Sequence, residues 1–333
     1  MKRERGLYAR IGRPQNLELA FRKAGRAKKH RRDYQAFAGN LKAELAALAD
    51  ELACEQVTVG DYRYFRVFDP KERLICAAPF RERVLHHAIM NVCEDNLERY
   101  AVAASYACRP NKGLHRAIAD AQSQCRRRRC YLKLDIRRFF DAIDHAIVLD
   151  MLARRFKDPP LLRLFDCILD SYHATPGKGL PIGNLVSQHL ANFYLGRFDH
   201  FVKEQLRVRS YLRYMDDFVL WGEDRTELKA LLPQIEAFLA DQLALALKPS
   251  QLNHCAAGLP FLGFRLYPDR IDLGPRARRR FIRKLVACER RYLRGEWTAT
   301  ELDAHVGPLL AFVKTADSLG FRRYVLRRYG VVT

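Results

Sequence analysis

The sequence lacks the cysteine spacing of a metal-binding or disulfide-rich protein. Nine cysteines are present, but they are scattered along the chain and no two of them form a C-x-x-C pair. An odd number of unpaired cysteines argues against a zinc site and a disulfide framework, and it favours a reducing compartment. We therefore expect a cytoplasmic protein.

Long apolar stretches are also missing. No segment approaches the roughly 18 consecutive apolar residues of a membrane-spanning helix, and the N-terminal residues lead into no apolar core of a signal peptide. The chain shows no internal repeat, low-complexity tract or long flexible linker. We expect no membrane partner. The 333 residues, 49% of them hydrophobic, are enough for a sizeable core in two or three subdomains.

Acidic residues are too few to balance the basic ones. The 38 acids face 59 lysines and arginines, the net charge is +21, and the basic residues are concentrated at the two ends. Such an excess favours a polyanionic partner, most simply a nucleic acid bound in a salt-dependent way. A merely basic protein or a membrane-surface binder is the alternative.

Hydrophobic periodicity predicts a protein of mixed α and β structure. We expect helices over about 15–55, 80–99, 146–156, 160–172, 184–206, 226–245 and 276–295, and in the last 30 or so residues. We expect strands over 131–135 and 261–267, and strand pairs over 62–74 and 211–221. This order favours an antiparallel sheet around the second strand pair.

Two adjacent acids stand between apolar, strand-forming residues in Tyr214-Met215-Asp216-Asp217. Adjacent residues of a strand face opposite sides of a sheet, but at a hairpin tip both can reach one side. Two carboxylates in an apolar setting repel each other and lose solvation, and a divalent cation relieves both effects. An ordinary solvated turn is the alternative for this pair alone.

A third acid, Asp135, ends the apolar strand that starts at Tyr131. If Asp135 faces the hairpin, three carboxylates surround one space. That arrangement suits two Mg²⁺ ions, with Mn²⁺ as a possible substitute, in an in-line displacement at phosphorus. Asp141 and Asp144 fall in the turn after the strand, and we predict local capping for both.

These motifs resemble those of reverse transcriptases. Asp135 with its following Phe-Phe-Asp resembles motif A, and Tyr-Met-Asp-Asp resembles motif C. Segments similar to the other motifs follow the family's order: 71–75 in the fingers, 105–113 before motif A, 179–194 for motif B, 247–249 for motif D and 261–264 for the primer grip. Seven motifs in order over nearly the whole chain make the resemblance specific.

The resemblance implies an α+β right-hand polymerase with fingers, a palm of antiparallel sheet plus helices, and a helical thumb. It implies four regions: a basic helical N-terminal region over 1–55, fingers over 56–130, a palm over 131–274 with fingers elements near 146–180, and a basic helical thumb over 275–333. RNA template, DNA or RNA primer and dNTPs are the implied partners.

The resemblance also implies roles for individual residues. Asp135, Asp216 and Asp217 would hold the two metal ions, and Lys248 would protonate the leaving pyrophosphate. The implied nucleotide contacts are Lys71, Arg73, Phe140, Ile182 and Gly183. The implied primer or template contacts are Arg109, Ser187, Gln188, Tyr214, Phe261, Leu262, Gly263, Arg279 and Arg283.

Three of these assignments have a plainer alternative. Phe140 falls at the sugar-selecting position, where its ring would clash with a ribose 2′-hydroxyl and favour dNTPs, but it could instead be a core aromatic. Lys71 and Arg73 would hold the triphosphate through charge-assisted hydrogen bonds, or they could be solvated charges on a hairpin. Lys248 could equally be a surface lysine.

The motif B segment, Gly179-Leu-Pro-Ile-Gly-Asn-Leu-Val-Ser-Gln188, is similar to that of reverse transcriptases from bacterial diversity-generating retroelements. Those enzymes miscopy template adenines and work with a small basic accessory protein. Retroviral enzymes have glutamine at the position of Ile182, so we hypothesise that Ile182 contributes to infidelity. Core packing is its alternative role.

Other readings stay open. Antiphage-defence, retron and group II intron-like enzymes share these motifs, so a defence enzyme with its own non-coding RNA is an alternative. We expect a group II maturase less, because no DNA-binding or endonuclease region follows the thumb. Rival functions are RNA synthesis on RNA, a non-catalytic RNA-binding scaffold, and protein-primed or template-free DNA synthesis.

The sequence also contains two arginine-rich segments. The four arginines 126–129 could contact RNA or an acidic partner, or form a solvated loop. The basic segment after Pro275 suits a thumb helix that grips the template–primer duplex.

Overall fold

The computed structural model describes residues 4–68 and 72–329. Lys71, one of the predicted nucleotide contacts, therefore lies outside the described residues. Four helices open the chain: α1 (Tyr8–Ile11), α2 (Pro14–Ala24), α3 (Arg32–Gly39) and α4 (Leu41–Ala53). The helical segment expected over 15–55 is thus divided into three helices, with breaks after Ala24 and at Asn40.

The N-terminal helices pack on the long helix α5 (Phe80–Tyr100) through an aromatic cluster. The ring of Phe80 meets those of Phe37 and Tyr34 edge-on at centroid distances of 5.3 Å, and that of Phe21 at 6.0 Å. Such edge-to-face pairs add to the stabilisation from burial alone. The cluster fixes the basic N-terminal helices to the body of the molecule.

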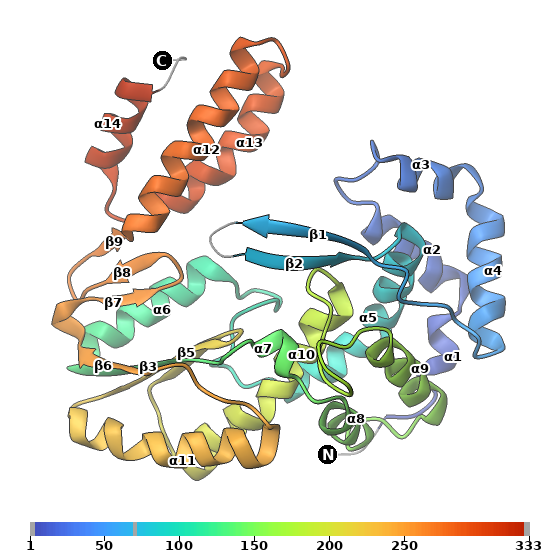
Figure 1. Ribbon diagram of the computed structural model, residues 1–333, viewed down its shortest axis with the longest axis horizontal. Helices are drawn as coiled ribbons and strands as arrows, with labels where there is room; N and C mark the ends of the chain where they lie inside the picture. Colours follow the sequence, from blue (N-terminus) through green and yellow to red (C-terminus); the bar gives the residue numbers. More distant parts are fainter. Residues whose placement is uncertain (1–3, 69–71, 330–333) are drawn as a thin grey trace.

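A two-stranded hairpin, β1 (Arg63–Phe68) and β2 (Glu72–Ala77), leads into α5. It reaches from the N-terminal helices across the centre of the molecule toward the C-terminal helices (Figure 1). Beneath its base lie α8 (His145–Ala153) and α9 (Pro159–Asp170).

The central sheet has four antiparallel strands in the order β4 (Tyr211–Tyr214), β5 (Asp217–Gly222), β3 (Cys130–Asp135) and β6 (Gln251–His254). Helix α11 (Arg225–Leu243) covers one face, and α6 (Leu114–Arg127) lies over the other (Figure 1). Because both faces are covered, four of the six β3 side chains are buried. Helix α6 was not among the helices that we expected.

Two further helices complete the region around the sheet. The four-residue helix α7 (Phe139–Ala142) follows β3, and α10 (Leu185–His200) continues into a π-helical turn over Phe201–Gln205. The helix expected over 184–206 is therefore present but changes its winding near the end.

A small three-stranded sheet, β7 (Leu259–Phe261), β8 (Phe264–Leu266) and β9 (Ile271–Leu273), links the central sheet to the C-terminal helices. The single strand expected over 261–267 was wrong. Leu262 and Gly263 have φ angles of +48° and +91°, and two successive positive φ angles make the tight hairpin turn that separates β7 from β8.

The chain ends in three helices, α12 (Pro275–Leu293), α13 (Ala299–Lys314) and α14 (Leu319–Tyr329), which stand above the sheets (Figure 1). Thr298 and Glu301 form a reciprocal capping box at the start of α13. Phe281 and Leu285 of α12 share a buried core with Val313 and Val325. None of the helices among the described residues has the length and apolar character needed to cross a membrane.

Candidate active site

Strand register brings two of the acids face to face. In the antiparallel pairing of β3 with β5, Asp135 lies directly opposite Asp217. Side chains directly opposite each other in such a pair share one face, with Cβ atoms about 5 Å apart. Lys133 and Tyr131, two and four residues back along β3, lie on that same face.

The third acid lies at the tip of the hairpin between β4 and β5. Tyr214 pairs with Asp217, so Met215 and Asp216 alone form the turn. Met215 has a φ of +54°, a conformation that is strained for any residue but glycine. The amide of Ile136 donates to the Asp216 carbonyl at 3.3 Å, which ties the turn to the end of β3. The structure therefore brings together the three acids that the sequence singled out.

Two lysines contact these carboxylates. Lys248 Nζ donates to Asp135 Oδ1 at 2.5 Å, while its backbone amide donates to the Asp135 carbonyl at 2.8 Å. Lys133 Nζ lies 3.2 Å from Asp217 Oδ2. Sequence reasoning missed Lys133, although its place two residues before Asp135 put it on the same face of the strand.

Burial and the charges of neighbouring carboxylates raise the pKa values of Asp216 and Asp217. Burial raises the pKa of Asp217 to about 7 against the opposing charge of Lys133, and the charges of Asp135 and Asp216 add to the shift. The pKa of Asp216 is also raised, mainly by burial and then by the charge of Asp135. A positive ion placed among the three would favour their charged forms.

The donor set fits a hard divalent cation. All three groups offer carboxylate oxygens, the preferred ligands of Mg²⁺. Asp217 Oδ1 is buried without a hydrogen-bond partner, which leaves it available to a ligand. Within residues 4–68 and 72–329, no three His, Cys, Asp or Glu side chains already form a metal cage. Asp135 contacts Lys248 and Asp217 contacts Lys133 instead.

Residues 69–266 match the family model described as reverse transcriptase (RNA-dependent DNA polymerase). The chain belongs to this family. Protein YkfC of Escherichia coli (strain K12) is 26% identical over 286 residues, covering 70% of this chain and 74% of that protein. The group II intron-encoded protein LtrA of Lactococcus lactis subsp. cremoris is 27% identical over 146 residues, 42% of this chain and 24% of that protein.

A solved structure confirms the fold of this reverse transcriptase. The apo telomerase from Candida tropicalis superposes with a TM-score of 0.50 at 9% identity, covering 65% of this chain and 49% of the telomerase chain. This likeness, with the mixture of helices and antiparallel sheet, bears out the predicted α+β right-hand polymerase. The chain spans about half of that telomerase chain and about a quarter of LtrA.

A buried ion pair supports the hairpin of β4 and β5 that carries Asp216 and Asp217. Arg213 and Asp199 are 1% and 0% exposed, and the guanidinium Nε and Nη2 donate to the two carboxylate oxygens at 2.8 and 2.6 Å. Arg213 Nη1 also donates to the Met215 carbonyl at 3.2 Å and to Asn192 Oδ1 at 3.0 Å. Tyr211 donates its hydroxyl to Asp199 at 2.6 Å. Sequence reasoning missed this network; a lone arginine within an apolar strand was its only signal.

Two of the predicted nucleotide contacts, Arg73 and Phe140, belong to β2 and α7. Arg73 is exposed on β2, and its charge partly offsets the rise in the pKa of Asp216. Phe140 is half-buried in α7, and its carbonyl accepts from the Leu180 amide at 2.8 Å. Their contact with a nucleotide stays a prediction.

The segment that resembles motif B is hydrogen-bonded to the hairpin of β1 and β2. The Ile182 carbonyl accepts from the Cys76 amide of β2 at 2.9 Å. Gly183 has a φ of +113°, and a Cβ there would lie 3.0 Å from Ile75 Cγ2. Only glycine adopts that conformation readily and leaves room for β2. The loop and the hairpin therefore hold each other in place.

Three predicted primer or template contacts need correction, because their side chains are not available. Phe261 and Ser187 are 1% and 2% exposed and lie inside the fold. Arg109 donates from Nε to Glu98 Oε2 at 2.9 Å, and further to the carbonyls of Val102 and Ser105. The structure gives these three residues supporting roles within the protein.

The remaining predicted primer or template residues are accessible in part or in full. Gln188, Tyr214 and Leu262 are half-buried, whereas Gly263, Arg279 and Arg283 are exposed. Their contacts with nucleic acid stay a prediction.

The two acids predicted to cap helices differ in outcome. Asp144 caps α8, since its side chain accepts from the amides of Ala146 and Ile147 at 3.1 and 3.2 Å. For Asp141 the prediction was wrong. It lies inside α7 and accepts from Arg138 Nε at 3.1 Å instead.

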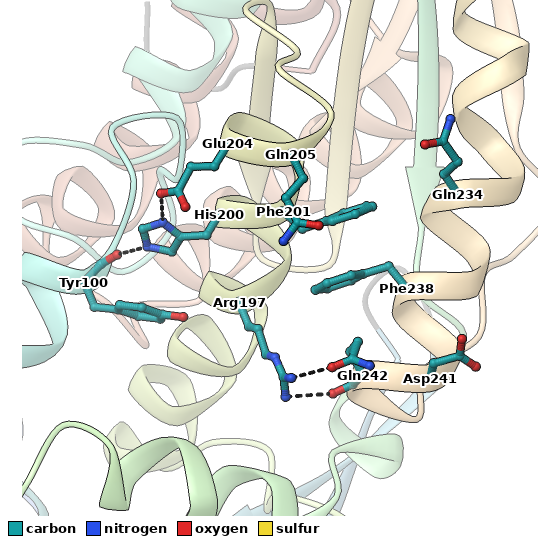
Figure 2. Close-up of a pocket in the computed structure, with 10 residues that line it drawn as sticks. All are labelled: Tyr100, Arg197, His200, Phe201, Glu204, Gln205, Gln234, Phe238, Asp241 and Gln242. Carbon is teal, nitrogen blue, oxygen red and sulfur yellow. Dashed lines mark hydrogen bonds and ion pairs between the residues drawn. The ribbon is translucent and has the colours of Figure 1, made fainter.

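A separate cavity of about 570 Å³ opens between the ends of α5 and α10, the π-helical turn and α11 (Figure 2). Stacked rings of Phe201 and Phe238, 4.0 Å apart, form part of its wall. Arg197 donates to Gln242, and His200 bridges the Tyr100 carbonyl and Glu204. None of the three acids lines this cavity, so it is separate from the candidate active site.

Proposed function

We propose that this reverse transcriptase copies an RNA template into cDNA, extending a DNA or RNA primer with dNTPs. The observation that carries the proposal is the convergence of Asp135, Asp216 and Asp217, with one Asp217 oxygen left without a partner. The proposal includes the division into an N-terminal region, fingers, palm and thumb at residues 55, 130 and 274. The nine free cysteines support a cytoplasmic location.

The three carboxylates would hold two Mg²⁺ ions, or Mn²⁺, which when bound supply charge stabilisation at the reacting phosphate. The protein's own residues position the substrates. Arg73 would bind the triphosphate through charge-assisted hydrogen bonds, and the Phe140 ring would exclude a ribose 2′-hydroxyl. The Lys248 ammonium, which contacts Asp135, would give a proton to the leaving pyrophosphate.

Primer extension by the full chain tests the proposal. The assay contains an RNA template, a DNA primer, Mg²⁺ and either dNTPs or NTPs. We expect extension with dNTPs, little with NTPs, and a loss of at least about 10³-fold for Asp216→Asn, because a metal ligand contributes several kcal/mol to the transition state.

Asp241→Asn is the matched control, since Asp241 is an exposed acid of α11 away from the site. Its extension rate should match that of the wild type. A folded wild type that binds RNA but extends no primer would instead support the non-catalytic scaffold. Preferential use of NTPs would point to RNA synthesis.

We further propose that the enzyme is the error-prone polymerase of a diversity-generating retroelement, assisted by a small basic accessory protein. The motif B residues that resemble that branch support this assignment, above all the apolar Ile182. A missing polar contact beside the templating base pair would reduce discrimination.

Sequencing of the cDNA products tests this branch. Ile182→Gln should lower the error frequency at template adenines relative to the other bases, whereas Ile271→Gln, a half-buried isoleucine of β9, should leave it unchanged. An unchanged error frequency at adenines in Ile182→Gln would refute the role of Ile182.

A second candidate is a bacterial reverse transcriptase that works with its own non-coding RNA, for example in antiphage defence. The similarity to a protein encoded by a group II intron favours it. Sequencing the RNA that copurifies with the full chain separates the two candidates. One structured RNA would favour the second candidate, and a template repeat would favour the first.

A further inference from the structure

A basic groove lies at the opposite end of the central sheet from the acids. It has a volume of about 360 Å³ and forms where α6 ends and β3 begins, on the left of the view in Figure 1. Its lining residues are Cys125, Arg126, Arg127, Arg128, Arg129, His254, Cys255, Ala256 and Pro268. Cys130 begins β3 and Asp135 ends it, a separation of roughly 17 Å at about 3.3 Å per residue. The groove is therefore separate from the catalytic site.

The four arginines of the groove differ in their hydrogen bonds and ion pairs with the rest of the protein. Arg128 is committed to the fold, since it donates to Glu223 Oε1 at 2.7 Å and to Ser210 Oγ at 3.1 Å. Arg126 Nε donates to the Pro268 carbonyl at 2.9 Å, which fixes that side chain at the rim. Arg127 and Arg129 are exposed, and their guanidinium groups have no hydrogen-bonding or ion-pair partner within the described parts of the chain.

The dipole of α6 explains the position of only some of these arginines. Arg126 and Arg127 occupy the last turn of α6, where the helix dipole favours cations. Arg129 lies beyond the helix, immediately before β3, and gains nothing from that dipole. The groove is therefore lined by two uncommitted arginines, the residues before and after Arg128 in the sequence.

We propose that this groove binds phosphates of an RNA segment outside the catalytic cleft. The inference rests on the proposed function, because it takes the copied RNA as the ligand. Planar guanidinium groups match phosphate oxygens with paired hydrogen bonds. Protein partners usually bind through buried Trp, Tyr or apolar anchors, and the lining offers no large apolar side chain. The net charge of +21 favours the same polyanion.

The test compares two double variants of the full chain with equal loss of charge. Arg127→Gln/Arg129→Gln alters the groove. Lys42→Gln/Lys157→Gln removes two exposed lysines at the other side of the molecule, on α4 and after α8. The affinity of each variant is measured over a range of salt concentrations for two ligands. One is a primed RNA–DNA duplex with long single-stranded RNA flanks, and the other is the same duplex trimmed of the flanks.

The groove variant should bind the flanked RNA more weakly than the control does. The slope of its plot of log Kd against log salt concentration should be smaller by about 2, which is about one for each lost phosphate contact. Its affinity for the trimmed duplex, and its rate of extension on that duplex, should match the control. Binding is measured without DNA synthesis. A protein that extends no primer would therefore contradict the proposed function, while the comparison of RNA binding between the two variants would still test the groove.

Three results would overturn the inference. Equal slopes for the two variants on flanked RNA would mean that the groove contacts no phosphate. An equal loss on the trimmed duplex would place the arginines in the catalytic cleft. Unchanged RNA binding with loss of an acidic protein from pull-downs of the full chain would assign the groove to that class of partner.

Discussion

At the scale of single residues, Arg213 is a charged side chain in the interior of the protein. Its guanidinium is fully buried, engages both oxygens of Asp199 and reaches the carbonyl of the strained turn residue Met215. A buried pair of this kind adds little net stability over apolar packing, but losing one partner costs about 3–5 kcal/mol. We infer that it holds the turn that presents Asp216.

Arg213→Lys tests this positioning role. Lysine keeps the charge, but it lacks the planar fork and cannot bind Asp199 and Met215 together. We expect kcat for primer extension to fall by roughly 10- to 100-fold, in line with a small misplacement of catalytic groups, with little change in the KM for dNTP. Steady-state kinetics provide the measurement.

Arg209→Lys is the matched control, because Arg209 is an exposed arginine just before the same strand. Thermal unfolding shows whether each variant is folded at the assay temperature. A folded Arg213→Lys enzyme with the kcat of the wild type would show that the ion pair merely stabilises the protein.

At the scale of elements, α5 contains a histidine that the fold keeps neutral. Burial lowers the pKa of His86 to about 3, and the charges of His87 and Arg83 act in the same direction. Its Nε2 lies 3.4 Å from Glu82 Oε1, and burial raises the pKa of that carboxyl. Burial in α5 therefore disfavours charge on both groups.

The sign of the pH dependence follows from the depressed pKa. The unfolded chain takes up a proton on His86 near pH 6.5, whereas the folded chain does not until about pH 3. Its contribution to stability is therefore complete above pH 6.5 and is lost as the pH falls toward 3. Between pH 6.5 and 5 the loss is about 2 kcal/mol.

Urea unfolding of His86→Leu beside the wild type isolates this effect. We expect the free energy of unfolding of the wild type to fall by about 2 kcal/mol more than that of the variant between pH 6.5 and 5. His30→Leu, at an exposed position, should behave as the wild type does. Parallel pH profiles for wild type and His86→Leu would contradict the buried neutral state.

Local patterns in the sequence predicted most of the elements and the meeting of the three acids. A strand ending in Asp135 and a hairpin ending at Asp216 and Asp217 are each visible in a few residues, and one antiparallel pairing joins them. Helix α6 was equally visible in the spacing of Ala117, Ile118, Ala121 and Cys125, which we overlooked.

The rest depends on partners that are distant in the chain. The contacts of Lys248 with Asp135 and of Arg109 with Glu98 form only when the chain has folded. The burial of Phe261 likewise follows from the hairpin turn beside it, whose Leu-Gly sequence is a weak signal. Motif position alone therefore could not distinguish residues that contact a ligand from those that support them.

At the scale of the whole molecule, two hydrophobic cores meet at the central sheet. One includes Leu132 and Leu134 of β3 and extends through α11 and α5 to the N-terminal helices. The other includes Tyr131 on the opposite face and continues through β8 into α12, α13 and α14. The sheet that holds the acids is therefore the common wall of both halves of the fold.

The basic face of α12 gives a prediction at this scale. Arg279→Gln/Arg283→Gln should weaken binding of the trimmed primer–template duplex whatever its sequence, and should make the salt dependence shallower by about 2. The control is again Lys42→Gln/Lys157→Gln. Salt titrations of binding provide the readout, and equal slopes for the two variants would show that α12 does not grip the duplex.

The pairing of Asp135 with Asp217 sets the tolerance of this enzyme to changes in length. A one-residue insertion in β3 would turn every later side chain of that strand, Asp135 included, to the other face and separate the two acids, and an insertion in β5 would turn the side chains after Asp217 out of register with β3. An insertion in a surface loop between the two strands would leave the pairing intact. Engineers who wish to add a tag or a new domain should therefore place it in such a loop and leave the two strands at their present length.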